Sequence, residues 1–590
     1  MIGSATPPPD SGPGTSLVSA DWPTWPQPGT PVSVREWGER RKRVSLARSA
    51  GIVAAAFVVS RALGLIREII LARQFGTSAD LGAYISAFRI PDLLFLVVMA
   101  GAFGSAFIPV FSGLLGNGES DAAWRLASVV LNISGVVVML LSAACWLTAP
   151  QLVQYIVAPQ ASSDVQALTT AIMRLLLLSP VFLGFGIAAK GILEGQDLFT
   201  LPAIAPVIYN AATILGALVL GPQIGVYGVA VGVVAGAAGF VLIQLPGLVR
   251  SGMRYQVAFD VRAPGVREVG TLLAPRLIGQ AAFQLNFIAV TSLAWRTGEQ
   301  SVAALNYAWQ LLMLPHGVLA LSISTVILPT LSRLWQTADI AAFRLTLLGA
   351  LRPLLFLSVP AAIVLFAFRV PIVQTLFQTG AFSAESTALV AAPLAFFAAG
   401  LVSYALVEAL TRAYYAMHDT RTPVIAGLAI VAINIALGLA LLDLLGFVAL
   451  ALALSVSTTI EAAILAVILE RRVGGVGSHL APWLLRVGGA AAIAAGVAAV
   501  LATPLTEMTA PGSAPRLLQL LMFAFTVCVV GAVYLGASWM LRIPELSLTL
   551  SQLARRLPVT AKQRLPSPIG ADRREIPEDQ SNGSVKSDSA

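Results

Sequence analysis

Charged residues are scarce in this sequence of 590 residues, because Asp, Glu, Lys and Arg together make up only 11% of it. A typical soluble domain contains about 25%. Hydrophobic residues make up 57% of the chain, and the mean hydropathy is +0.83. This balance excludes a soluble globular protein. The apolar runs are longer than barrel strands and lack the alternation of apolar and polar residues that barrel strands show. We therefore expect an all-α polytopic membrane protein.

Cysteine and histidine are also rare, and catalytic motifs are missing. The two cysteines, Cys145 and Cys528, lie in separate apolar runs, so the sequence predicts neither a disulfide framework nor a metal site. It contains no Gly-x-x-x-x-Gly-Lys-Ser/Thr phosphate loop, no His-Glu-x-x-His and no Gly-x-Ser-x-Gly. We therefore expect a transporter that is not an enzyme and has no bound cofactor.

The formal net charge of +8 comes mostly from basic residues between the apolar runs, which indicates membrane orientation and not a nucleic-acid partner. With the amino terminus inside, thirteen basic residues fall in inside loops and helix ends and four in outside ones. We expect both termini in the cytoplasm, at a bacterial plasma membrane. We also expect residues 1–44 to form a disordered, proline-rich and then basic cytoplasmic tail, and residues 542–590 a second disordered cytoplasmic tail.

About fourteen apolar runs fill the body of the chain, and segments of the first half recur about 222 residues later. Pro91 and Pro109 in the first half correspond to Pro315 and Pro329 in the second. Matching interruptions in duplicated halves are typical of alternating-access transporters, so we predict hinges at these prolines. A single proline in a membrane helix is equally well explained as a tolerated kink.

The correspondence between the two halves of the sequence predicts two six-helix repeat lobes around a central cavity, plus two carboxy-terminal helices. The predicted units are an N-lobe at 45–249, a cytoplasmic linker at 250–265, a C-lobe at 266–470 and the last two helices at 471–541.

A few charged residues lie inside the apolar runs, where an arginine near the centre of a span costs about 2.5 to 3.5 kcal/mol on insertion scales. Arg61, Arg67 and Glu68 lie in the first run. Helical geometry places Arg67 about 120° from Arg61 and places Glu68 two turns from Arg61, so neither arginine has an obvious partner on its own helix. Arg89 and Asp92 flank Pro91 one turn apart, which favours a local ion pair.

Snorkelling to the interface is the other structural explanation for Arg61 and Arg89, beside a role in binding an anion. Arg276 and Arg352 are secondary candidates within the membrane.

Five motifs resemble those of the lipid II flippases, also called MurJ or MviN, of the multidrug/oligosaccharidyl-lipid/polysaccharide exporter superfamily. The similarity looks collinear over about residues 45–541. The motifs are Ser60-Arg61-Ala62-Leu63-Gly64 with Arg67-Glu68; Phe88-Arg89-Ile90-Pro91-Asp92-Leu93-Leu94; Gly101-Ala102-Phe103 leading to Ala106-Phe107-Ile108-Pro109; Thr325-Val326-Ile327-Leu328-Pro329-Thr330-Leu331-Ser332; and Tyr414-Tyr415 leading through Asp419 to Thr422-Pro423.

The resemblance implies fourteen helices around a cationic cavity and export of an undecaprenyl-diphosphate-linked glycopeptide, the peptidoglycan precursor lipid II. It implies that Arg61 and Arg67 contact the diphosphate, with Arg89 where the family commonly has Lys and Asp92 where it has Asn. Several charges that the family usually carries are absent. The residues at those positions are Gly82, Phe95, Ala100, Trp309 and Gln310.

From these intramembrane charges we predict a flippase. In it Arg61 and Arg67, with Arg89 and Asp92, hold an anionic headgroup while the lipid tail of the same molecule stays in the bilayer. The membrane potential, Na+ or H+ can each supply the driving force, and cell-wall synthesis proteins are candidate partners. Two alternatives remain: an exporter of another polyprenyl-linked glycan or an amphipathic compound, and a non-transporting membrane scaffold.

Overall fold

The structure is a computed structural model that describes residues 34–96, 107–260, 262 and 265–546. These residues form helices and loops and contain no strand. The helices of the first half are α1 (Val34–Phe75), α2 (Ala79–Ala87), α3 (Arg89–Leu94), α4 (Ile108–Gly116), α5 (Ser120–Leu147), α6 (Ala149–Leu152), α7 (Ser163–Leu176), α8 (Ser179–Glu194), α9 (Thr200–Leu215), α10 (Gly221–Ile224), α11 (Val226–Leu242) and α12 (Leu245–Arg250).

The second half contains longer, less interrupted helices. They are α13 (Val266–Ala294), α14 (Ser301–Gln336), α15 (Ile340–Ala367), α16 (Arg369–Phe377), α17 (Ala384–Ala416), α18 (Arg421–Leu445) and α19 (Val448–Val473), followed by α20 (Val476–Met508) and α21 (Arg516–Met540).

Ten helical segments within the described residues are long and apolar enough to cross a membrane. The other four predicted spans correspond to α1, α13, α14 and the segment that contains α2, α3 and α4. The count of about fourteen is consistent with this arrangement. The chain is a multi-pass α-helical membrane protein, as its composition predicts.

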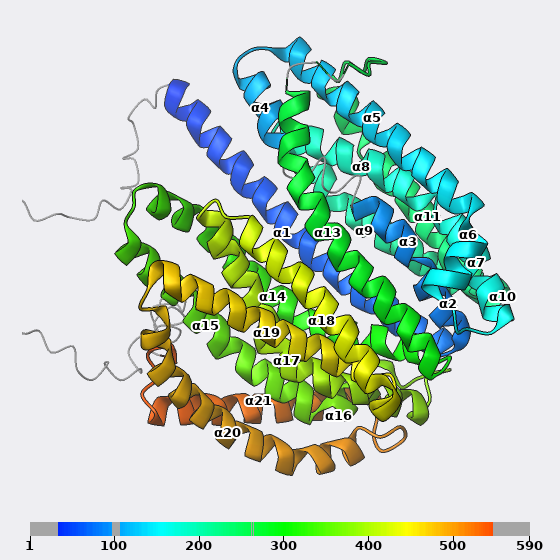
Figure 1. Ribbon diagram of the computed structural model, residues 1–590, viewed down its shortest axis with the longest axis vertical. Helices are drawn as coiled ribbons and strands as arrows, with labels where there is room; N and C mark the ends of the chain where they lie inside the picture. Colours follow the sequence, from blue (N-terminus) through cyan, green and yellow to red (C-terminus); the bar gives the residue numbers. More distant parts are fainter. Residues whose placement is uncertain (1–33, 97–106, 261, 263–264, 547–590) are drawn as a thin grey trace, which may run out of the picture.

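The helices gather into two lobes with α1 and α13 between them (Figure 1). In the first lobe α9 packs on α1 and α11, and in the second α17 packs on α14, α15 and α19. Helix α13 contacts α3 and α5 of the first lobe and α18 of the second. Helices α20 and α21 pair along one edge of the second lobe and contact it through α15.

The matching prolines have different surroundings in the two halves. In the first half the helix breaks at Phe88, so that Pro91 lies in the short helix α3 and Pro109 lies in the first turn of α4. Pro315 and Pro329 lie inside α14, which continues without a break for 36 residues. At these prolines the sequence repeat is therefore not matched by a repeat of local structure, because the described break lies in the first half.

The two lobes meet where α1 ends and α2 begins. The Ala381 N–H donates to the Arg73 carbonyl at 2.8 Å, and the buried hydroxyl groups of Thr77 and Ser386 hydrogen-bond at 2.9 Å. A Cβ atom on Gly76, whose φ is +56°, would lie 2.5 Å from the Ala381 carbonyl oxygen. We call this contact, made by Arg73, Gly76, Thr77, Ala381 and Ser386, the interlobe seam. Only glycine at residue 76 allows this close backbone approach.

The loop motif that leads through Asp419 to Thr422-Pro423 has a structural explanation at the other end of the second lobe. The Asp419 carboxylate accepts hydrogen bonds from the side chain and the backbone N–H of Thr422 and forms an ion pair with Arg472. Burial of Asp419 opposes its ionisation, but these contacts outweigh that effect and lower the pKa of its carboxyl to about 2. Asp419 therefore ties the loop before α18 to the end of α19.

The carboxy-terminal helix pair is attached by two carboxylates. Glu470 accepts hydrogen bonds of 2.8 to 2.9 Å from the backbone N–H groups of Gly475, Val476 and Gly477, which caps the first turn of α20. The indole of Trp483 donates to the buried carboxylate of Glu545 at 2.7 Å. Both contacts lie in the first turns of α20, where they hold this helix to the end of α19 and to the chain that follows α21.

Two boundaries of the expected tails are corrected by the structure. Helix α1 begins at Val34, so the basic run at 34–44 continues the first membrane helix. Residues 542–546, expected in the second tail, pack on α20 through Glu545. The first segment is continuous with a long helix, and the second follows α21 after a turn at 541–542 and is held by its contact with Trp483. The remaining residues of both tails lie outside the described part of the chain.

Candidate functional site

A cavity of about 250 Å³ lies beside the interlobe seam, between α1, α2, α3 and α9 of the first lobe and α14 of the second. Its charged residues are Arg67, Glu68, Arg89 and Asp92. We call it the charged cavity. The rest of its wall consists of Leu71, Leu81, Tyr84, Ile85, Phe88, Tyr209, Asn306 and Gln310. The fold thus brings together four of the charged residues that the sequence predicts for the site.

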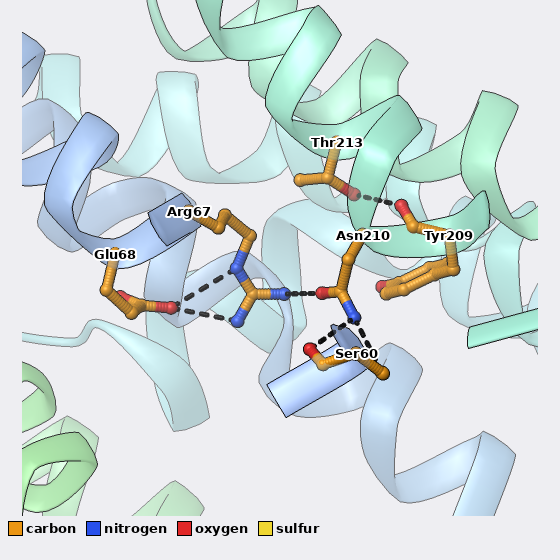
Figure 2. A network of polar contacts seen from close by, with 6 residues as sticks. All are labelled: Ser60, Arg67, Glu68, Tyr209, Asn210 and Thr213. Carbon is orange, nitrogen blue, oxygen red and sulfur yellow. Dashed lines mark hydrogen bonds and ion pairs between the residues drawn. The ribbon is translucent and has the colours of Figure 1, made fainter. Parts of the chain in front are cut away.

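Arg67 is fixed between two side chains of the first lobe, as Figure 2 shows. Its guanidinium donates to Glu68 Oε1 from Nη2 at 2.8 Å and from Nε at 3.3 Å. Its Nη1 donates to Asn210 Oδ1 at 3.4 Å, and the Asn210 amide in turn donates to the Ser60 hydroxyl at 3.3 Å. Asn210 therefore connects α9 to two turns of α1 and holds Arg67 on the cavity wall.

The ion pair between Arg67 and Glu68 corrects the expectation that Arg67 has no partner on its own helix. Neighbouring residues leave a helix about 100° apart. That angle describes the Cα–Cβ directions only, and the long arginine side chain bends back to reach the adjacent carboxylate. The ion pair makes this part of the wall neutral.

Arg89 corrects a second expectation, because the described residues contain no ion pair between Arg89 and Asp92. The helix breaks just before Arg89, and its side chain turns toward α13. There its Nε donates to the Thr291 hydroxyl at 2.8 Å and its guanidinium lies over the Phe287 ring at 5.3 Å. The terminal nitrogens of Arg89 have no hydrogen-bond partner among the described residues, so they can still donate to an anion.

Arg61 does not line the charged cavity. Its side chain is exposed, and its guanidinium lies over Phe57 at 5.4 Å. A Cβ atom on Gly317 of α14 would lie 3.5 Å from Arg61 Nη2, so Arg61 faces the second lobe. Arg61 and Arg67 therefore lie on the same helix and serve different parts of the space between the lobes.

The secondary candidates do not gather at this cavity. Arg352 is half-buried on α15 and is not part of the cavity wall. The side chain of Arg276 on α13 lies outside the part of the chain that the structure describes. Pro315 lies at a different, apolar cavity of about 370 Å³, which is also lined by Pro360, Ala361, Val364, Leu365, Val527 and Gly531.

The structure shows what occupies two of the places where the resembling family usually carries a charge and this chain does not. A Cβ atom on Gly82 would lie 3.0 Å from the Trp295 ring, which fills the space where the resembling family has an acid. Trp309 packs edge-on against Phe287 and Phe397, while Gln310 lines the charged cavity. The cavity thus keeps a polar amide where a charge is absent. Phe95 follows α3 and is half-buried, and Ala100 lies outside the described residues.

Several residues of the site were not found from the sequence, including Tyr84, Thr291 and Asn306. Asn210 had a detectable signal, because it is a polar residue within the apolar run at 199–220. Intramembrane polar residues are candidates for internal contacts. The sequence pattern gives no means of pairing Asn210 with Arg67, since the two residues are 143 positions apart.

The sequence was compared with known families and proteins. The pattern of the family described as lipid II flippase MurJ matches residues 71–521. The lipid II flippase MurJ of Burkholderia cenocepacia is 31% identical over 521 residues, which cover 84% of this chain and 98% of that protein. The probable lipid II flippase MurJ of Rhizobium meliloti is 29% identical over 540 residues, covering 90% of this chain and 100% of the relative.

Solved structures share the fold. A lipid II flippase MurJ in an inward closed conformation superposes with a TM-score of 0.67 at 22% identity, covering 83% of this chain and 98% of the other. An inward-facing multidrug resistance MATE family transporter of the MOP superfamily gives a TM-score of 0.61 at 15% identity, covering 72% of this chain and 99% of the other. At these identities the similarity concerns the architecture.

Proposed function

The chain belongs to the lipid II flippase MurJ family, and from this premise we propose that it carries lipid II from the inner to the outer leaflet by alternating access. It is a transporter, a multi-pass protein of the bacterial inner membrane, whose substrate is a lipid-linked molecule within the bilayer. We propose that both termini lie in the cytoplasm. The observation that carries the proposal is the charged cavity between the lobes, in which Arg67 and Arg89 line the same space.

The arginines suit a diphosphate for a chemical reason. Guanidinium groups donate several hydrogen bonds in one plane and bind phosphate oxygens with charge assistance. The terminal nitrogens of Arg89 are free to do so, and Arg67 is already held in place by Asn210. A diphosphate would compete with Glu68 for Arg67, while Asp92 would repel it. We propose that this balance keeps the anion weakly enough bound to be released.

The size of the charged cavity supports a cycle of opening and closing. Its volume of about 250 Å³ equals that of about eight water molecules at about 30 Å³ each. This space suits a diphosphate but not a glycopeptide as well. We propose that the lobes separate to admit the complete headgroup and that the interlobe seam opens on the other side to release it.

We propose that the apolar cavity takes part of the prenyl chain. Pro315 on its wall follows Gln310 of the charged cavity by five residues, or about 7.5 Å along α14. The two residues also lie about 140° apart around α14, so a lipid whose diphosphate lies in the charged cavity would pass around this helix to extend its chain toward α15 and α21 and into the bilayer. Arg61, exposed between the lobes, is placed to contact the headgroup outside the charged cavity.

An inside-negative membrane potential would favour outward movement of two negative charges by about 4 to 5 kcal/mol at 100 mV. We expect reconstituted protein to flip lipid II faster in vesicles with an imposed potential of this sign than in vesicles without one. The rate is measured from the lipid II that becomes accessible on the receiving side. An unchanged rate would remove the potential as the driving force and leave coupling to Na+ or H+.

Rescue of bacterial cells depleted of their own lipid II flippase tests the cargo. We expect the wild-type chain to restore growth and cell shape, and Arg61→Ala to weaken the rescue because a basic contact for the headgroup is lost. Arg174→Ala is the matched control, since Arg174 lies over Trp146 on the first lobe and not on the cavity wall.

A well-expressed wild type that fails to rescue would point to another polyprenyl-linked cargo. Full rescue by Arg61→Ala would reject the role of Arg61.

A further inference from the structure

The connection between the two lobes is held against a membrane helix. Residues 253–260, which we call the interlobe strap, follow α12 and run along α5. The Asn132 amide donates to the carbonyl oxygens of Gln256 at 3.1 Å and Ala258 at 2.9 Å. The Ser128 hydroxyl accepts from the Gln256 N–H at 3.1 Å. Two side chains of α5 thus satisfy backbone groups of the strap.

The ends of the interlobe strap are clamped nearer the start of α5. Arg254 forms an ion pair with Asp121 at 3.0 Å, and Asp260 forms one with Arg125 at 2.9 Å. The strap therefore rises along α5 from its first turn to the level of Asn132 and returns. Both ends are charged, and the middle is not.

The depth of Asn132 follows from the length of α5. This helix has 28 residues and is about 42 Å long, whereas the hydrocarbon core of a bilayer is about 30 Å thick. Asn132 lies about 18 Å from Ser120 and about 22 Å from Leu147 along the axis. A 30 Å hydrocarbon layer that α5 alone crosses leaves at most about 12 Å of the helix outside at one end, which places Asn132 within that layer. The carbonyl groups that Asn132 holds lie at the same depth.

The side chains of the strap suit lipid at this depth. Val257 is 79% exposed, and Tyr255 and Phe259 are each 53% exposed. Alternate residues of an extended segment project to the same side. The hydroxyl of Tyr255 donates to Asn132 Oδ1 at 2.8 Å, so its polar end is satisfied by the protein while the ring stays exposed. Irregular backbone is tolerated within a membrane where protein satisfies its polar groups.

We propose that the interlobe strap is a re-entrant segment whose apolar side chains, Val257 and Phe259 above all, contact the acyl chains of the leaflet on the side of the amino terminus. The ion pairs of Arg254 and Arg125 lie at the headgroup level of that leaflet. This proposal differs from the expectation of a cytoplasmic linker at 250–265. It also means that the strap moves with the first lobe.

Site-directed spin labelling of the full chain in liposomes tests the proposal. Cys145 and Cys528 are replaced by alanine, and a nitroxide is attached to Val257→Cys. Two reference sites share the α5 region: Leu140→Cys, 65% exposed about two turns beyond Asn132, and Glu119→Cys, exposed just before the helix. Power saturation compares collisions with oxygen, which concentrates in lipid, and with a water-soluble nickel chelate.

We expect the oxygen-to-nickel ratio at residue 257 to match that at residue 140 and to exceed that at residue 119 several-fold. A ratio like that of residue 119 would place the strap in water and overturn the proposal. Protection from both reagents would also overturn it and would indicate contact with a second copy of the chain. Adding Asn132→Ala should raise nickel access at residue 257 while leaving the label at residue 140 unchanged. Unchanged access at residue 257 would reject the anchoring role of Asn132.

Discussion

A protein in which Thr77 and Ser386 are both replaced by cysteine is expected to stop transporting when the two thiols are oxidised and to recover when they are reduced. The hydroxyl oxygens of these buried residues lie 2.9 Å apart across the interlobe seam. Two sulfur atoms in these places need only a small shift to reach the S–S bond length of about 2.05 Å. A covalent bond here would hold the lobes together, and a headgroup could not leave on that side.

The experiment is done after Cys145 and Cys528 are replaced by alanine, with flipping of lipid II by reconstituted protein as the measurement. Ser403→Cys with Thr459→Cys is the matched control, because those hydroxyl groups are also 2.9 Å apart but both belong to the second lobe. Oxidation of the control should leave transport unchanged. Complete cross-linking of residues 77 and 386 with normal transport would show that the interlobe seam stays closed throughout the cycle.

Replacing Arg67 with alanine is expected to reduce flipping by about 10- to 100-fold. Hydrogen bonds to charged groups contribute about 1.5 to 3 kcal/mol, and each 1.4 kcal/mol corresponds to a factor of ten. Arg67→Lys should retain part of the activity, since an ammonium keeps the charge but loses the planar set of donors. Initial rates of reconstituted protein, at matched amounts in the membrane, measure the effect.

A double variant separates two reasons for such a loss. Arg67→Ala leaves Glu68 without its ion-pair partner at the charged cavity, and an unpaired buried carboxylate can by itself harm the protein. If Arg67 binds the anionic headgroup, Arg67→Ala with Glu68→Ala should remain as defective as the single variant. Recovery of transport in the double variant would show that Arg67 serves only to neutralise Glu68.

The charged residues of the site show how far the sequence could predict it. Arg67, Arg89 and Asp92 could be selected because charge inside an apolar run is costly and is retained for a reason. Their partners could not be predicted, because Asn210 and Thr291 are 143 and 202 positions away in the chain. The expected pair of Arg89 with Asp92 was wrong for the same reason. A break in the helix and an acceptor on α13 offered Arg89 a different contact.

The prolines show the same limit for the fold. The sequence shows that Pro91 and Pro315 occupy matching positions in two related halves. Whether a proline breaks a helix depends on which neighbours satisfy the freed backbone groups. The chain breaks before Pro91 and continues through Pro315, and this difference gives the first lobe the short helix that carries Arg89 and Asp92.

By itself the sequence determined that the chain crosses a membrane as helices and that it has about fourteen spans in two related halves, and it selected intramembrane charges as candidates for the site. These properties follow from composition and local periodicity, since lipid solvates neither backbone nor charge. Only the tertiary structure decided that Arg67 and Arg89 share a cavity while Arg61 lies outside it, that Trp295 fills the space beside Gly82, and that the interlobe strap rises along α5. These depend on contacts between distant segments, where packing selects one arrangement among many that the same local pattern allows.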